Sequence, residues 1–193
     1  MIKHILAGTI AILSVTVGYG QKAWRLRSDS YIGLSIGELA PYGQGQTVNG
    51  FSKGPWFLGL GAGLNYYHFR NIPLFLSVTR DLPVSDKKNR LFLILDGGID
   101  LPWYKRGFPL YQRTISSFRP GPYWSAGMAY RWPLSEHGRL ALLFSAAYAM
   151  KKLTERQTTS AACYNPPDCT VTSLTDKYEY LDRNLTLAVG VEF

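Results

Sequence analysis

The stretch "NLTLAVGVEF", residues 184–193, alternates bulky apolar residues with small or polar ones and finishes on an aromatic side chain. Such alternation is typical of a β-strand, in which successive side chains point to opposite faces. Chain ends usually fray, so an apolar aromatic residue at the last position needs a reason. The bulky positions are Leu185, Leu187, Val189, Val191 and Phe193.

The same two-residue period recurs along most of the chain, and no segment shows a sustained apolar stripe at helical spacing. The sequence therefore predicts an all-β protein of about eight strands. The match is weakest at residues 44–53, which are expected to form a strand mainly because their neighbours need a connection. The predicted strands contain residues 32–37, 44–53, 56–67, 72–81, 91–101, 123–132, 139–150 and 184–193.

The two faces of these strands differ in a way that indicates their surroundings. One face carries bulky Leu, Trp, Met and Phe, whereas the other carries Gly, Ala, Ser, Asn, Thr and a few charges. A soluble sandwich would bury its bulky face and cover the other with long charged side chains, which are sparse here. Small residues fit the narrow interior of an eight-stranded barrel. Side chains expected to pair inside it are Asp96, Asp100, Arg131 and Glu192.

The predicted fold is a closed antiparallel up-and-down transmembrane β-barrel with its bulky face toward lipid. Closure is required because hydrocarbon leaves no partner for an unpaired strand edge. Aromatic residues gather near the strand ends, as expected for two interfacial belts. At the periplasmic end the predicted belt contains Tyr31, Trp56, Phe57, Phe92, Trp132 and Phe193. At the outer end it contains Tyr66, Tyr67, Trp103, Tyr104, Trp124, Tyr148, Tyr178 and Tyr180.

Connection lengths also differ between the two ends of the predicted barrel. Residues 102–119 and 151–179 form long polar intervals, which we expect to be extracellular loops, whereas the periplasmic connections are shorter. Within the second interval, residues 170–180 could add a hairpin beyond the membrane. Eight strands leave a filled interior, so passage of small solutes is not expected.

Residues 1–20 read as a secretory signal peptide. Lys3 precedes an uncharged apolar run, Ile5–Val17, and Gly18 and Gly20 provide small residues for cleavage before Gln21. The run is shorter than a transmembrane helix needs. The predicted mature barrel domain is therefore residues 21–193, located in the bacterial outer membrane.

The chain carries a formal net charge of +8 at pH 7. Export argues against a nucleic-acid partner, and the basic residues cluster in the predicted outer loops. The sequence therefore predicts a basic rim that is either solvated or in contact with the phosphates of lipopolysaccharide. The candidate residues are Lys105, Arg106, Arg113, Arg119, Lys151, Lys152 and Arg156.

The C-terminal alternation resembles the β-signal of bacterial outer-membrane proteins, in which the last strand ends in an aromatic residue. This resemblance implies that Leu187, Val189, Val191 and Phe193 recruit the barrel-assembly machinery and that the last strand closes against the first. The wider order "GLGAGLNYY" (59–67), "IPLFL" (72–76), "FLILDGGIDLPW" (92–103) and "GPYWSAGMAYRW" (121–132) is similar to small outer-membrane β-barrel proteins of the Bacteroidetes type. Most members of that family have no assigned biochemical activity.

Motifs for chemistry are few. The glycines of "GLGAGL", residues 59–64, lack the final glycine of a dinucleotide-binding motif and precede no helix. Cys163 and Cys169 in "CYNPPDC" are expected to form a disulfide in an oxidising compartment, with two free thiols as the alternative. His68 and His137 lie at strand ends or turns, with no inward serine beside them on the same strand.

We therefore expect a non-enzymatic outer-membrane barrel, without a cofactor, that has a structural or surface-interaction role. Two alternatives stay open. The first is an outer-membrane enzyme that modifies lipid A. The second is a secreted soluble barrel that binds a small apolar ligand, and it would place bulky residues inside. The oligomeric state is left open.

Overall fold

The computed structural model describes residues 23–37, 40–66, 70–83, 90–103, 114–134, 140–160 and 173–193. The predicted signal peptide lies outside these ranges. Among the described residues, there is no helix with the length and hydropathy that a membrane span requires. The described elements are all β-strands.

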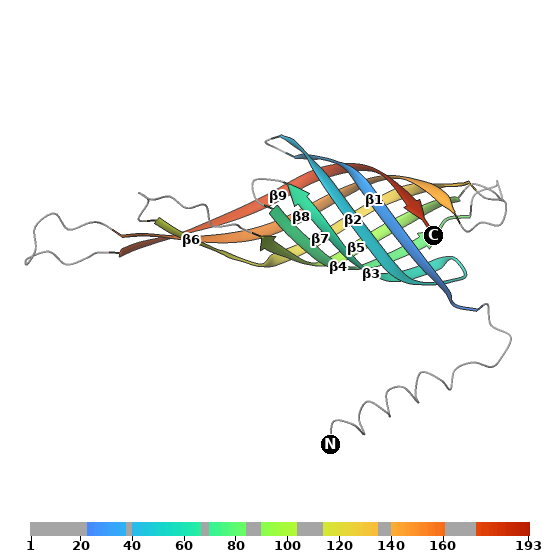
Figure 1. Ribbon diagram of the computed structural model, residues 1–193, viewed down its shortest axis with the longest axis horizontal. Helices are drawn as coiled ribbons and strands as arrows, with labels where there is room; N and C mark the ends of the chain where they lie inside the picture. The colour runs from blue at the N-terminus through green and yellow to red at the C-terminus, as the bar shows by residue number, and fades with distance from the viewer. Residues whose placement is uncertain are drawn as a thin grey trace, which may run out of the picture.

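Eight strands form a closed antiparallel barrel, as predicted (Figure 1). Consecutive strands pair in sequence order, and β9 closes the barrel against β1 through register pairs such as Leu34 with Leu187. The strands are β1 (Arg25–Gly37), β2 (Pro41–Lys53), β3 (Trp56–Tyr66), β4 (Arg70–Asp81), β5 (Arg90–Trp103), β7 (Gly121–Pro133), β8 (Ala141–Ser160) and β9 (Ser173–Glu192).

A ninth strand, β6 (Thr114–Arg119), lies outside the barrel proper. It pairs with residues 154–159 of β8, whereas β7 pairs with residues 141–151 of the same strand. Strands β6 and β7 therefore lie end to end along one edge of β8. Pro120 separates them. Proline lacks a backbone N–H, which accounts for a break in the ladder at this position.

The barrel has two different ends. The turn end contains the β2–β3 connection, where Gly54 has φ of 60°, and the last residue of the chain. The extension end is the one beyond which β8 and β9 continue as a pair (Figure 1). Both strands are 20 residues long, whereas β3 has 11. Part of the predicted loops at 102–119 and 151–179 is therefore strand.

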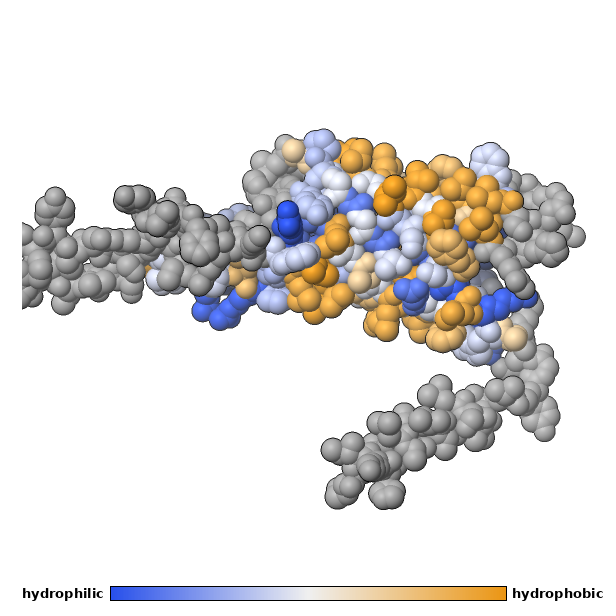
Figure 2. Space-filling view, viewed as in Figure 1, coloured by the Kyte–Doolittle hydropathy of each residue, from blue (hydrophilic) through white to orange (hydrophobic). Residues whose placement is uncertain are grey.

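Bulky apolar side chains face outward over the body of the barrel, as the alternation predicts. Leu60, Leu95, Phe144 and Leu187 are 69%, 59%, 42% and 48% exposed. Figure 2 shows hydrophobic residues over much of the side of the barrel between its two ends, with polar residues among them. This arrangement is opposite to that of a soluble ligand-binding barrel, whose bulky residues would lie inside.

Exposed aromatic residues gather at both ends of this apolar surface, and cations lie over several of their rings. Arg80 lies 5.0 Å from the ring centroid of Trp56 at the turn end, and Arg70 lies 5.5 Å from that of Tyr66 at the extension end. The turn-end belt contains Trp24, Phe51, Trp56, Trp132 and Phe193. The belt at the extension end contains Tyr66, Trp103, Trp124 and Tyr148.

Three predicted belt residues are not in the belt. Tyr31, Phe57 and Phe92 are at most 5% exposed and point into the lumen, so their assignment to the surface was wrong. Tyr178 and Tyr180 are exposed on the extension of β9, and Tyr67 and Tyr104 lie outside the described residues. Two buried clusters fill the lumen: Tyr31, Phe92, Ala129, Leu143 and Ala188, and Val48, Phe57, Phe75, Tyr123 and Ala149.

Inward glycines make room for these rings. A Cβ atom at Gly61 would lie 2.3 Å from a ring carbon of Phe75, which itself packs against Tyr123 with ring centroids 5.4 Å apart. The predicted small interior residues are therefore present, but their role is to accommodate large aromatic neighbours rather than to fill the lumen by themselves.

We expect Gly61→Ala to lower the free energy of unfolding by about 1–3 kcal/mol, because the added methyl group overpacks the lumen against Phe75. Urea unfolding of the refolded protein in micelles measures this difference. Gly43→Ala is the control, since a Cβ atom there has nothing within 4 Å. Equal effects of the two substitutions would contradict the close packing described here.

Candidate functional site

The extension is a small sheet in which β6, β8 and β9 continue past the barrel. Strand register determines which side chains share a face, because directly paired residues lie on the same side. Arg119 pairs with Thr154, and Arg156 pairs with Lys177. The face that continues the outer apolar surface of the barrel carries five cations, which we call the basic face: Arg119, Lys152, Arg156, Lys177 and Arg183.

Only part of this charge is neutralised locally. Glu179 lies on the same face, and its carboxylate is 2.7 Å from Lys152 and 2.6 Å from Lys177. Hydrogen bonds from these two lysines lower the pKa of Glu179 to about 2. Among the described residues, no carboxylate forms an ion pair with the exposed side chains of Arg119, Arg156 and Arg183.

The arrangement of these cations is suited to anions. Arg156 and Lys177 are direct cross-strand partners, and like charges in that position repel one another. An anion bound between them would relieve the repulsion. Arginine also binds phosphate oxygens through two parallel N–H groups, which gives geometric specificity.

The opposite face of the extension has a different character. It continues the lumen side and carries Leu153, Glu155 and Tyr180. The Tyr180 hydroxyl donates a hydrogen bond of 2.9 Å to Glu155, which raises the pKa of the tyrosine. The cations therefore lie on one side of the sheet rather than around it.

Lys151 is not part of the basic face, which corrects the prediction that it contacts lipopolysaccharide. Its side chain is 2% exposed and lies inside the lumen. The ammonium group donates a hydrogen bond of 3.2 Å to the Tyr42 hydroxyl and lies 3.7 Å from Asp182. Asn184 donates to the same two partners, at 2.8 Å and 3.1 Å. Lys151 thus crosses the lumen from β8 to β2.

The remaining predicted site residues divide into two groups. Arg119, Lys152 and Arg156 lie together on the basic face. Two further members, Lys177 and Arg183, were not predicted. Their spacing of an even number of residues from Leu181 and Leu185 could have placed them on the same outward face of the strand. The positions that lie outside the described residues are Lys105, Arg106, Arg113, Cys163, Cys169, His68 and His137.

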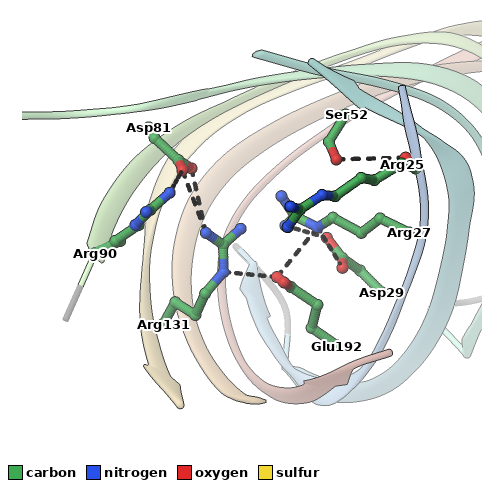
Figure 3. A network of polar contacts seen from close by, with 8 residues as sticks. All are labelled: Arg25, Arg27, Asp29, Ser52, Asp81, Arg90, Arg131 and Glu192. Carbon is green, nitrogen blue, oxygen red and sulfur yellow. Dashed lines mark hydrogen bonds and ion pairs between the residues drawn. The ribbon is translucent and has the colours of Figure 1, made fainter. Parts of the chain in front are cut away.

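A chain of ion pairs joins five strands at the turn end of the lumen (Figure 3). Arg27 of β1 contacts Asp29 at 2.5 Å and Glu192 of β9 at 3.1 Å. Arg131 of β7 contacts the same Glu192 at 2.6 Å and Asp81 of β4 at 3.3 Å. Asp81 is also 3.0 Å from Arg90 of β5. The predicted internal pairing of Arg131 and Glu192 is therefore confirmed.

Asp96 and Asp100 were also expected to pair inside the barrel, and the structure does not show this. Neither forms an ion pair with a described residue. Asp96 accepts a hydrogen bond of 2.9 Å from Ser125 through Oδ2, but its Oδ1 and both oxygens of Asp100 lack a hydrogen-bond partner in the described structure. In the same residues, no group of three or more His, Cys, Asp or Glu side chains is placed to hold a metal.

Three of the four proposed assembly residues share the outer face of β9, and the fourth, Phe193, follows directly after the strand. Leu187, Val189 and Phe193 are 48%, 46% and 60% exposed, and Val191 is partly exposed. The backbone N–H of Phe193 donates to the Ser28 carbonyl at 2.9 Å, and the Ser28 N–H donates back at 3.2 Å. The last residue is therefore paired with the first strand, while its ring remains available at the surface.

No protein-family model matches the sequence, and no curated protein matches it. The fold is similar to that of solved β-barrels. The structure of Neisserial surface protein A aligns with this one at a TM-score of 0.56 and 9% sequence identity, over 90% of this chain and 98% of that chain. The outer membrane protein OprG from Pseudomonas aeruginosa gives 0.50 and 9%, over 90% and 98%. The outer membrane protein AlkL, solved in DMPC bilayers, gives 0.46 and 14%, over 93% of both chains.

Proposed function

We propose that the protein is an integral barrel of the bacterial outer membrane. The exposed apolar surface supports this, because so large an apolar area in contact with water would be strongly unfavourable. The two aromatic belts fit the two membrane interfaces. Strands β3 and β5, with 11 and 14 residues, are long enough to cross the hydrocarbon core of a bilayer when tilted. The fold of OprG, named as an outer membrane protein, adds support.

We further propose that the basic face binds the phosphate groups of lipopolysaccharide. The observation that carries this is its position: the cations lie on the lipid-facing side of β8 and β9, directly beyond the aromatic belt. Lys152 follows Tyr148 and Met150 on the same face of β8. Lipid phosphates lie at this level, just outside the acyl chains, where each nearby Lys or Arg contributes about 1 kcal/mol of attraction.

Removing three of these charges should weaken lipopolysaccharide binding strongly. We expect the triple variant Arg119→Gln, Arg156→Gln, Arg183→Gln to lose about 100-fold in affinity, since three contacts of about 1 kcal/mol each are lost. The measurement is equilibrium binding of lipopolysaccharide to the refolded barrel in micelles, repeated with dephosphorylated lipopolysaccharide. The wild-type protein should bind the dephosphorylated form as weakly as the variant does.

A matched control removes the same number of charges from the turn end: Arg25→Gln, Lys53→Gln, Arg80→Gln. These residues lie at the opposite end of the barrel, so affinity should stay within a few-fold of wild type. If both triple variants lose affinity equally, net charge rather than the basic face determines binding. If neither does, lipopolysaccharide is not the ligand.

The remaining parts of the proposal concern biogenesis and chemistry. We propose that the barrel-assembly machinery recognises the outer face of β9, that Cys163 and Cys169 form a disulfide, and that the chain belongs with Bacteroidetes-type barrels. We propose no enzymatic activity and no cofactor. A changed acylation pattern of lipid A after deletion of the protein would instead support the lipid-modifying enzyme.

A further inference from the structure

The lumen contains a small cavity between β1, β2, β4 and β5. It has room for about one water molecule. Most of its lining residues carry a side-chain oxygen: Asp29, Tyr31, Gln46, Ser77, Thr79 and Asp96. Two of those oxygens, Thr79 Oγ1 and Asp96 Oδ1, are buried without a hydrogen-bond partner in the described structure.

The charges that surround this cavity do not balance. Asp29 is neutralised by Arg27, and Glu192 and Asp81 are neutralised by Arg27, Arg131 and Arg90. Asp96 accepts a hydrogen bond from the Ser125 hydroxyl, but no described cation is paired with it. A buried carboxylate without a cation is costly, so either a proton on Asp96 or a bound cation is required to remove or offset one negative charge.

We propose that this cavity binds one dehydrated monovalent alkali cation, sodium or potassium, through Asp96 Oδ1 and Thr79 Oγ1. Such an ion would neutralise the Asp96 carboxylate, contact both unpartnered oxygens and fill the cavity. Water alone would leave the negative charge without a partner, and a proton on Asp96 alone would leave the cavity empty. The competing arrangement is therefore a protonated Asp96 together with one water molecule, which sodium or potassium would not stabilise. Hard cations take oxygen ligands, but Mg²⁺ usually keeps several waters, for which the cavity has no room.

Thermal unfolding of the refolded barrel in micelles tests the proposal. Folded protein that binds the ion is stabilised by mass action, so the unfolding temperature should rise with sodium or potassium chloride, by about 3–6 °C per tenfold increase above the dissociation constant. N-methylglucamine chloride at the same ionic strength should produce no such rise. A rise that is equal in all three salts would overturn the proposal.

Variants locate the effect within the lumen. Asp96→Asn removes the charge and Thr79→Val removes the second oxygen, and each should abolish the cation-specific rise. Asp100→Asn is the matched control, because it removes the other unpaired carboxylate of β5 but does not line the cavity, and it should retain the rise. Loss of the response in Asp100→Asn would overturn this location.

Crystals grown with thallium(I) provide a direct measurement that does not depend on the variants folding. An anomalous peak in contact with Asp96 Oδ1 and Thr79 Oγ1 is the expected result. Density at that point without anomalous signal would identify a water molecule and overturn the proposal. Lipopolysaccharide binding by the basic face is measured separately, so failure of either proposal leaves the other intact.

Discussion

Replacing Arg27 with methionine is expected to lower the free energy of unfolding by about 3–5 kcal/mol, because the substitution leaves buried carboxylates without their cation. Arg27 is 7% exposed and contacts Asp29 and Glu192. Its guanidinium also lies 4.6 Å from the ring centroid of Phe57 and 5.3 Å from that of Phe92. Urea unfolding in micelles, followed by tryptophan fluorescence, gives the change in free energy.

Arg90→Met is the matched control, since Arg90 belongs to the same network but its side chain is 54% exposed. A solvent-exposed pair contributes about 0–1 kcal/mol, so the effect of Arg90→Met should be small. The double variant Arg27→Met, Asp29→Leu should recover part of the lost stability, because it removes one of the two unpaired carboxylates. A loss below about 1 kcal/mol for Arg27→Met would contradict a role for this buried cation.

Alternation along the strands predicts which residues face outward, aromatic residues included, whereas position near a strand end does not predict which aromatic residues form the belts. Phe57 lies between Trp56 and Leu58, which both face outward, so strict alternation already places it inside. The expectation of a belt at strand ends overrode this pattern. The rings fit the lumen only because glycines such as Gly61 lie beside Phe75, and that pairing depends on register rather than composition.

Lys151 shows why a cluster of charges is an incomplete guide to a surface. It is adjacent to Lys152 in sequence, yet the two side chains point to opposite faces of β8. The partners of Lys151, which include Tyr42 and Asp182, lie on β2 and β9 and are far apart in the sequence. A single sequence shows that a lysine is on the inner face, but not that its partners reach it across the lumen.

The extension was only partly predictable for a different reason. Beyond the barrel both faces of β8 and β9 are polar or mixed, so no lipid or core imposes an apolar alternation. Residues 151–160 therefore look like a loop in sequence, and their strand character follows from the long register with β9. Once that register is known, Arg156 and Lys177 become neighbours, and the basic face can be recognised.

Phe193→Ala is expected to reduce the amount of folded protein in the outer membrane of cells by about tenfold or more, while refolding of the purified chain in detergent is nearly unchanged. The ring is 60% exposed, so its loss removes little packing. The backbone pairing of Phe193 with Ser28 does not require the side chain. The proposed role of the ring is recognition by the assembly machinery, which acts only in cells.

Two measurements separate recognition from stability. Heat-modifiable gel mobility of membrane fractions reports folded barrel in cells, and urea unfolding in micelles reports stability. Leu60→Ala is the control, because Leu60 is 69% exposed on the same outer surface but lies on β3, far from the last strand. If both variants reach the membrane equally well, the aromatic ring of Phe193 does not serve as an assembly signal. If Phe193→Ala fails in detergent as well, the ring contributes to the fold itself, because closure against β1 would then depend on more than the backbone.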